Sequence, residues 1–188
     1  MLLNSLQEND LDINEFYDSI VNELKIRGWE TKTQFLKNNN ISPCQGCFEC
    51  WVKIPGICKI NDDAREILKE VMKSDLIIGL TKLNFGIYSS EYKNILDRFL
   101  PLVLPFFEKK KGEIFHQLRY EKYPSFIILG IVENSNYEKK ELFRTLIHRN
   151  LMDLNSAIIE TMIYEKGEDL IDFSNKFKAI LTNVEVKL

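Results

Sequence analysis

The chain has 188 residues, of which 45% are hydrophobic and 28% are charged, and its formal net charge is −3. A chain of this length is close to the size of one domain and can bury a core without disulfide or metal staples. We therefore expect one domain over residues 1–188. The apolar fraction argues against a disordered chain, and four cysteines are too few for a disulfide scaffold. Mild acidity without a basic stripe argues against nucleic acid as a partner.

The sequence contains no apolar run near the roughly 18 residues that a membrane span needs. Its first six residues carry no basic side chain and open no long apolar segment, so a secretory signal is not expected. We expect a cytoplasmic protein without a membrane partner. In such a reduced compartment, a tight cysteine cluster indicates metal or redox chemistry.

Hydrophobic periodicity predicts an alternation of strands and helices along the chain. A short strand within 1–6 is followed by a helix over 12–27 and a strand over 31–36. A helix over 62–73 leads to a fully apolar strand over 75–80 and a helix over 89–99. The last predicted elements are strands over 125–132 and 157–164 and helices over 137–152 and 169–181. The basic run Lys109–Lys111 is predicted to be a solvated loop.

This alternation predicts an α/β fold with a parallel sheet and right-handed crossovers. Five strands with helices on both faces match the flavodoxin-like doubly wound sheet, with strand order 2-1-3-4-5. Ligands of such sheets bind at the carboxyl ends of the strands, where the strand order reverses. The predicted site loops are therefore residues 5–12, 43–58, 81–88 and 133–136.

All four cysteines fall in the cysteine-rich segment, residues 43–58, with the pattern C-x2-C-x2-C-x7-C. Two-residue spacing allows successive thiolates to turn toward one centre, and Gly46 allows a close backbone approach. The first three cysteines have the spacing of bacterial ferredoxin runs, in which a more distant cysteine completes a set. Four thiolates suit a [4Fe–4S] cluster or tetrahedral Zn²⁺. The spacing also leaves free or reversibly oxidised thiols as an alternative. The candidate metal ligands are Cys44, Cys47, Cys50 and Cys58.

Two stretches of the sequence resemble the NADPH-dependent FMN reductase-like flavoproteins, and within them the iron–sulfur flavoproteins. The first stretch is Cys44-Gln-Gly-Cys-Phe-Glu-Cys-Trp, followed by Pro55-Gly-Ile-Cys-Lys-Ile-Asn-Asp-Asp63. The second runs from Asp75-Leu-Ile-Ile-Gly-Leu-Thr81 through Phe85-Gly-Ile-Tyr-Ser-Ser-Glu-Tyr-Lys-Asn-Ile-Leu-Asp-Arg98. The resemblance implies FMN at the strand ends, a [4Fe–4S] cluster on the four cysteines and electron transfer by dimers or tetramers.

The resemblance and the predicted strand ends together define the candidate flavin-binding residues. The loop after the 75–80 strand would line the flavin ring, and the 133–136 loop follows the next strand. Lys82 would bring a charge to one edge of the ring. The candidates are Ser5, Gln7, Asn9, Thr81, Lys82, Asn84, Phe85, Gly86, Glu133 and Asn134.

The first loop departs from the family pattern, in which an arginine and hydroxyl residues hold the FMN phosphate. Glu8 stands where the arginine is expected, and Ile13 replaces a hydroxyl residue. The first 24 residues contain six acids and no lysine or arginine. A phosphate here would meet like charge, which costs about 4 kcal/mol per pair at ~4 Å in a partly screened site. The alternative function is therefore a degenerate family member that has lost FMN binding and serves as a non-catalytic or partner subunit.

Other expected partners follow from the redox interpretation. Electrons would come from a nicotinamide or from a redox protein. We expect a homodimer or homotetramer, and the aromatic residues after the 89–99 helix are candidates for its interface or for a core or lid. These residues are Phe106, Phe107, Phe115, Tyr120 and Tyr123.

Overall fold

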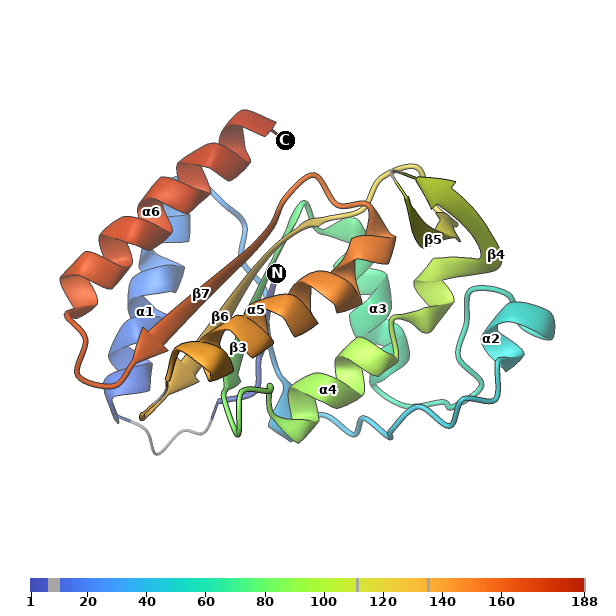
Figure 1. Cartoon of the computed structure of the whole chain (residues 1–188), viewed down its shortest axis with the longest axis horizontal. Coiled ribbons are helices and arrows are strands. Elements are labelled where there is room, and N and C mark those ends of the chain that lie inside the picture. The colour runs from blue at the N-terminus through green and yellow to red at the C-terminus, as the bar shows by residue number, and fades with distance from the viewer. Residues whose placement is uncertain (7–10, 111, 135, 188) are drawn as a thin grey trace.

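The computed structural model describes residues 1–6, 11–110, 112–134 and 136–187, and its centre is a five-stranded parallel sheet (Figure 1). The strands lie in the order β2-β1-β3-β6-β7. Counting only the strands of this sheet, the order is 2-1-3-4-5, so the predicted flavodoxin-like fold is confirmed. The strands are β1 (Leu2–Asn4), β2 (Thr33–Phe35), β3 (Leu76–Lys82), β6 (Ser125–Val132) and β7 (Ile159–Glu165).

Helices cover both faces of this sheet. Figure 1 shows α1 (Leu11–Ile26) and α6 (Leu170–Lys187) together on one face. The other face is covered by α3 (Ala64–Lys73), α4 (Ser90–Asp97) and α5 (Tyr137–Leu151). The remaining helical elements are α2 (Glu49–Val52) and the 3-10 turns Leu36–Asn38, Leu100–Leu102 and Met152–Leu154.

The two faces have separate apolar cores, and this explains why the central strands are almost continuously apolar. In β6, Phe126 and Ile128 pack on the α3–α5 side, whereas Ile127 and Leu129 pack on the α1–α6 side. Successive side chains of a strand point to opposite faces, so a sheet covered on both faces needs apolar residues at every position. Among the described residues, no helix is both long enough and apolar enough to cross a membrane.

The sequence prediction was wrong between α4 and β6, where the strand–helix alternation is interrupted. Residues Val103–Lys110 (β4) and Glu113–Leu118 (β5) form a separate antiparallel two-stranded sheet. Lys109 and Lys110 therefore lie in a strand and not in a loop, while Lys111 lies outside the described residues. Pro105 lies in β4 where the pairing register shifts between Val103 and Phe107, and such irregular positions tolerate proline.

Gly79 of β3 allows α4 to approach the sheet closely. A Cβ atom built at Gly79 would lie 1.9 Å from the Tyr92 hydroxyl oxygen and 2.9 Å from Cδ1 of Ile128. Tyr92 is only 1% exposed, so its ring has no free space into which it can move. The position of α4 on the sheet therefore depends on this glycine.

We expect Gly79→Ala to lower the free energy of unfolding by about 1–3 kcal/mol, because it overpacks this contact. Urea denaturation of the variant measures the change. Adding Tyr92→Phe should recover part of the loss, because the nearest clashing atom is then removed. An unchanged urea midpoint in the single variant would contradict the close packing of α4 on β3.

Candidate functional site

The carboxyl ends of β1 and β3 are joined to the start of α4 by a buried chain of hydroxyl groups. The Ser5 hydroxyl donates to the carbonyl oxygen of Leu80 at 2.9 Å, and the Ser89 hydroxyl donates to Ser5 at 2.9 Å. The backbone N–H of Ser89 donates to the Thr81 hydroxyl at 2.9 Å. Ser89 also accepts a bond from the Tyr92 N–H and so caps α4. The candidate residues Ser5 and Thr81 are therefore brought together, but their hydroxyl groups already have partners within the protein.

The loop between β3 and α4 presents one aromatic side chain to solvent. Phe85 is 89% exposed and has a φ of 55°, in the left-handed region that a phenylalanine rarely adopts. Asn84 and Ile87 form an isolated bridge around it, and Gly86 lies against α5, where an added Cβ would be 3.2 Å from Cα of Lys139. The backbone at Phe85 is therefore strained, and this strained conformation holds an exposed ring at the edge of the sheet. Strained residues of this kind are often found at functional sites.

The other candidate flavin residues lie at the same edge or outside the described part of the chain. Lys82 and Glu133, at the ends of β3 and β6, form an ion pair at 3.6 Å. Asn134 is exposed just before α5. Gln7 and Asn9 lie outside the described residues, so the structure does not place the predicted phosphate loop.

The cysteine-rich segment holds its four thiols in different environments. Cys50 is buried, Cys44 and Cys58 are half-buried, and Cys47 is exposed; all four are free thiols. Burial raises the pKa of Cys50 to about 11, with further contributions from the charges of the other three cysteines. The four thiols are thus close enough to influence one another electrostatically. Among the described residues, no three histidine, cysteine or acidic side chains are gathered closely enough to hold a metal ion.

Trp51 anchors α2 to the base of the β4–β5 hairpin. Its indole N–H donates to the carbonyl oxygens of Leu100 and Val103, at 3.1 and 3.0 Å. On one side its ring stacks on Phe48 with centroids 5.2 Å apart, and on the other it lies 5.2 Å from the ring of His116 in β5. The hairpin that the sequence prediction missed is therefore the support for the turn that carries Cys47 and Cys50.

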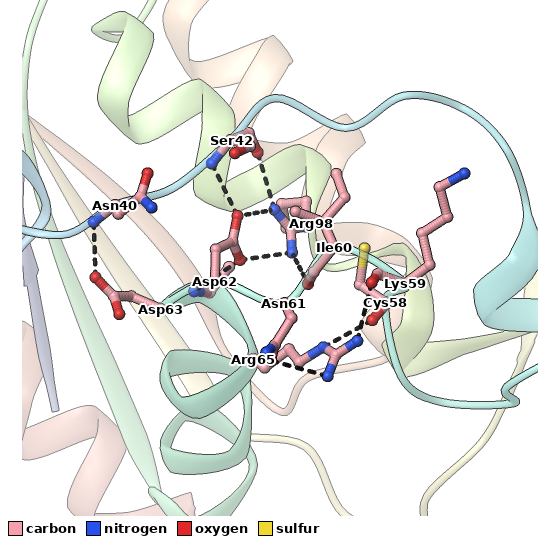
Figure 2. A network of polar contacts seen from close by, with 11 residues as sticks. Asn40, Ser42, Cys58, Lys59, Ile60, Asn61, Asp62, Asp63, Arg65 and Arg98 are labelled. Carbon is pink, nitrogen blue, oxygen red and sulfur yellow. Dashed lines mark hydrogen bonds and ion pairs between the residues drawn. The ribbon is translucent and has the colours of Figure 1, made fainter.

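A buried ion pair between Arg98 and Asp62 joins the two ends of the cysteine-rich segment (Figure 2). The two guanidinium NH groups donate to the two carboxylate oxygens at 2.8 Å each, and the side chains are only 1% and 3% exposed. The same guanidinium donates to the carbonyl oxygen of Ser42, before the segment, at 2.9 Å, and to that of Ile60, after it, at 3.3 Å. Asp62 in turn accepts the backbone N–H of Ser42 at 2.9 Å.

A second set of contacts fixes the chain that leaves the segment toward α3. Arg65 donates through Nε to the carbonyl oxygen of Cys58 at 2.8 Å and through its terminal nitrogens to Lys59 and Asn61, both at 3.0 Å. The Asp63 carboxylate accepts the backbone N–H of Asn40 at 2.7 Å. Figure 2 shows these residues grouped around the first turn of α3.

The cysteine-rich segment and the candidate flavin loops lie at opposite ends of α4. Figure 1 shows α2 at the far side of the molecule from the β3–α4 loop, with α4 running between them. Cys44 lines a cavity of about 410 Å³ together with residues of α4, β5 and α5. Cys58 lines a different cavity of about 440 Å³, beside α3. The sequence analysis placed both candidate sites at the strand ends, whereas the structure separates them within one chain.

Sequence reasoning missed three residues that organise these sites, namely Ser89, Arg98 and Asp62. Ser89 had a signal, because a serine before an amphipathic helix is a preferred cap. Arg98 and Asp62 are 36 residues apart, and no spacing rule connects them. The sequence feature that could have indicated burial of Arg98 is its position at the end of a helix that has an apolar buried face.

Similarity to known proteins was found in both sequence and structure. No protein-family model matches the chain. The chain is 35% identical over 74 residues to an iron–sulfur flavoprotein of Methanosarcina thermophila, covering 39% of this chain and 38% of that protein. It is 37% identical over 86 residues to an iron–sulfur flavoprotein of Methanocaldococcus jannaschii, covering 46% and 44%.

The chain resembles the iron–sulfur flavoproteins. The resemblance stated from its motifs is thereby confirmed, although each match spans less than half of the relative's length. Two solved structures share the fold over most of their length. An FMN-dependent NADH-azoreductase from Bacillus anthracis in complex with FMN has a TM-score of 0.66 at 9% identity, covering 97% of each chain. An oxidoreductase from Corynebacterium diphtheriae has a TM-score of 0.60 at 10% identity, covering 97% of this chain and 92% of that one.

The ion pair predicts a pH dependence of stability. Burial by itself would raise the pKa of Asp62, but hydrogen bonds from Arg98 and from the Ser42 N–H outweigh burial and lower the pKa below the ordinary value of 3.8. A carboxylate with a lowered pKa stabilises the fold above the unfolded-state pKa, and this stabilisation is lost as the pH falls through the folded-state pKa.

We expect Asp62→Asn to lower the free energy of unfolding by about 3 kcal/mol at pH 7, because it leaves Arg98 buried without its anion. The difference from the wild type should shrink well below pH 4, where the wild-type carboxyl is also neutral. Urea titrations of the wild type and the variant at pH 7 and well below pH 4 measure the two differences in the free energy of unfolding. A difference that is the same at both pH values would contradict the role of the ionised pair.

Proposed function

We propose that the protein is an electron-transfer flavoprotein that holds a [4Fe–4S] cluster on Cys44, Cys47, Cys50 and Cys58 and FMN at the carboxyl ends of β1, β3 and β6. The observation that carries the proposal is the set of four free thiols on one closed segment attached to a flavodoxin-like sheet. When bound, the flavin supplies two-electron chemistry and the cluster one-electron transfer. The role of the protein is to position the two groups and to set their potentials.

The donor set suits a cluster better than it suits a hard cation. Four thiols are soft ligands, and no carboxylate or histidine pattern for calcium or magnesium accompanies them within the segment. Cys50 is buried, so thiolate formation there is unfavourable until a positive centre is bound. The thiols must move closer together than they are in the structure, and the turn at Gly46, with a φ of 61°, is the place where the backbone can tighten most easily.

The proposed flavin site uses the strand-end residues for orientation. Ser5, Thr81 and Ser89 hold the strand ends and α4 together, Lys82 and Glu133 place opposite charges beside them, and Phe85 offers an exposed ring face. The names of the similar proteins, which include iron–sulfur flavoproteins and an FMN-dependent azoreductase, support both cofactors.

We further propose a nicotinamide or a redox protein as the electron partner, since an NADH-dependent azoreductase shares the fold. A homodimer or homotetramer is proposed on the basis of exposed aromatic residues, because Phe106 and Phe107 are each 62% exposed. Tyr123, a further interface candidate, is instead buried in the core. Four reduced thiols favour a reducing compartment such as the cytoplasm.

Anaerobic purification tests the cofactor assignment directly. We expect about four iron and four acid-labile sulfide atoms per chain, together with broad absorbance in the visible range. Cys50→Ser and Cys58→Ser should each lose most of the iron while keeping the far-ultraviolet circular dichroism of the fold. A protein that stays colourless after anaerobic reconstitution with iron, sulfide and FMN would overturn the proposal.

The alternative, a partner subunit without FMN, is favoured by two observations. The first 24 residues carry six acids and no basic residue, and the Ser5 and Thr81 hydroxyls are already engaged inside the protein. A titration followed by flavin fluorescence separates the two functions. Binding at micromolar concentration or tighter excludes the alternative, whereas recovery of binding only in Glu8→Arg supports it.

Phe85 offers a test that does not depend on activity. We expect Phe85→Gly to change the free energy of unfolding by less than about 1 kcal/mol, because the ring is exposed and glycine adopts a positive φ without strain. FMN affinity should fall about tenfold if the ring packs on the flavin. Tyr137→Ala, which removes another exposed ring at the start of α5, is the matched control and should leave affinity unchanged. Equal FMN affinities of the wild type, Phe85→Gly and Tyr137→Ala would show that Phe85 does not contact the flavin.

A further inference from the structure

The cysteine-rich segment is closed at both ends by one guanidinium group. Arg98, just after α4, donates to the carbonyl oxygen of Ser42 on the incoming side and to that of Ile60 on the outgoing side. Asp62 completes the arrangement, because it accepts both terminal NH groups of Arg98 and the backbone N–H of Ser42. Figure 2 shows the two chain segments converging on this pair.

None of the contacts of Arg98 and Asp62 with each other, with Ser42 or with Ile60 uses a thiol, although the Arg98 guanidinium also forms a side-chain hydrogen bond with Cys58. The atoms involved are two side-chain groups and backbone atoms of residues that flank the cysteines. The contacts are therefore compatible with free thiols and with thiolates bound to a metal. Charge-assisted bidentate bonds of this kind are short and directional, and burial of both partners protects them from water and salt.

Closing a loop has an entropic cost that must be met by some contact. In small metal-binding domains the bonds to the metal offset this cost, and the chain is unfolded without metal. Here the flanks of the segment are already tied to α4, which is itself packed on the sheet through Tyr92 and Ile95. Inside the loop, the Gly56 N–H donates to the carbonyl oxygen of Cys50 at 2.9 Å, and the indole of Trp51 is fixed to the base of the hairpin.

We propose that Arg98 and Asp62 are positioning residues that join the two ends of the cysteine-rich segment through protein contacts alone, so that a metal centre enters a loop whose ends are already closed and in which only the turn that carries the thiols has to tighten. The part of this inference that concerns the metal rests on the proposed function. The part that concerns the loop does not, because the closure can be measured in protein that contains no metal.

The experiment follows thiol accessibility in reduced, metal-free protein. Alkylation by iodoacetamide is quantified by mass spectrometry at Cys50, which is buried, and at Cys47, which is exposed and serves as an internal reference. In the wild type we expect Cys50 to react much more slowly than Cys47. In Arg98→Met the ratio of the Cys50 rate to the Cys47 rate should rise at least about tenfold, because several charge-assisted hydrogen bonds are lost from the closed state.

Two further variants separate closure from general stability. Arg98→Met combined with Asp62→Leu removes both charges, and such replacements of a buried pair often restore stability. We expect this double variant to unfold near the wild-type urea midpoint and still to label Cys50 rapidly, because the bonds to Ser42 and Ile60 are absent. Ile95→Ala is the matched control: it leaves a cavity in the same helix but keeps the ion pair, so its labelling ratio should stay close to that of the wild type.

Three results would overturn the inference. The first is a labelling ratio in Arg98→Met equal to that of the wild type. The second is an equal increase in Ile95→Ala, which would show that general loss of stability exposes Cys50. The third is slow labelling in the double variant, which would show that closure does not need the guanidinium.

Reconstitution with iron and sulfide distinguishes this inference from the proposed function. If the wild type takes up iron, we expect the double variant to take it up at least several-fold more slowly, at a matched urea midpoint. If the wild type takes up no iron but the labelling results hold, the positioning role stands and the cluster assignment fails. If the wild type takes up iron, and all variants match it in the labelling ratio of Cys50 to Cys47 and in the rate of iron uptake, the cluster assignment stands and the positioning role fails.

Discussion

The rest of the structure around the cysteines depends on the buried ion pair between Arg98 and Asp62. Both side chains are almost fully removed from solvent, and the contacts that tie Ser42 to Ile60 across the cysteine-rich segment pass through them, while Asp63 joins the same two chain segments at Asn40. Burying two charges has a large desolvation cost, so such a pair is a poor way to gain stability. It is a good way to select one arrangement, because a guanidinium without its carboxylate partner has no acceptable alternative position in the core.

Helix α4 is the element that relates the two candidate sites. Its first turn is capped by Ser89, which is bonded to the ends of β1 and β3, and Arg98 lies just beyond its last turn. At 1.5 Å per residue, Ser89 and Arg98 are about 13.5 Å apart along the helix axis. The close approach of Tyr92 to Gly79 holds the helix on the sheet, so the distance between the two sites is set by rigid packing and not by a loop.

Similarity in sequence and similarity in structure extend over different lengths of the protein. The iron–sulfur flavoproteins match less than half of the chain, while an azoreductase structure and an oxidoreductase structure match its fold over nearly all of it at about one identical residue in ten. The strand ends of this fold are one candidate ligand site, because parallel sheets bind ligands there, and the cysteines mark a second candidate site. The acidic N-terminal stretch bears only on the first of these sites.

The sequence by itself determined the fold class and the spacing of the four thiols. The apolar runs of β3 and β6 are long enough to require cover on both faces, and the spacing of the four cysteines is visible without coordinates. Tertiary structure alone decided the β4–β5 hairpin, the partition of the two sites along α4 and the pairing of Arg98 with Asp62. Those features depend on contacts between residues far apart in the chain, and local periodicity carries no information about which distant groups will share a buried position.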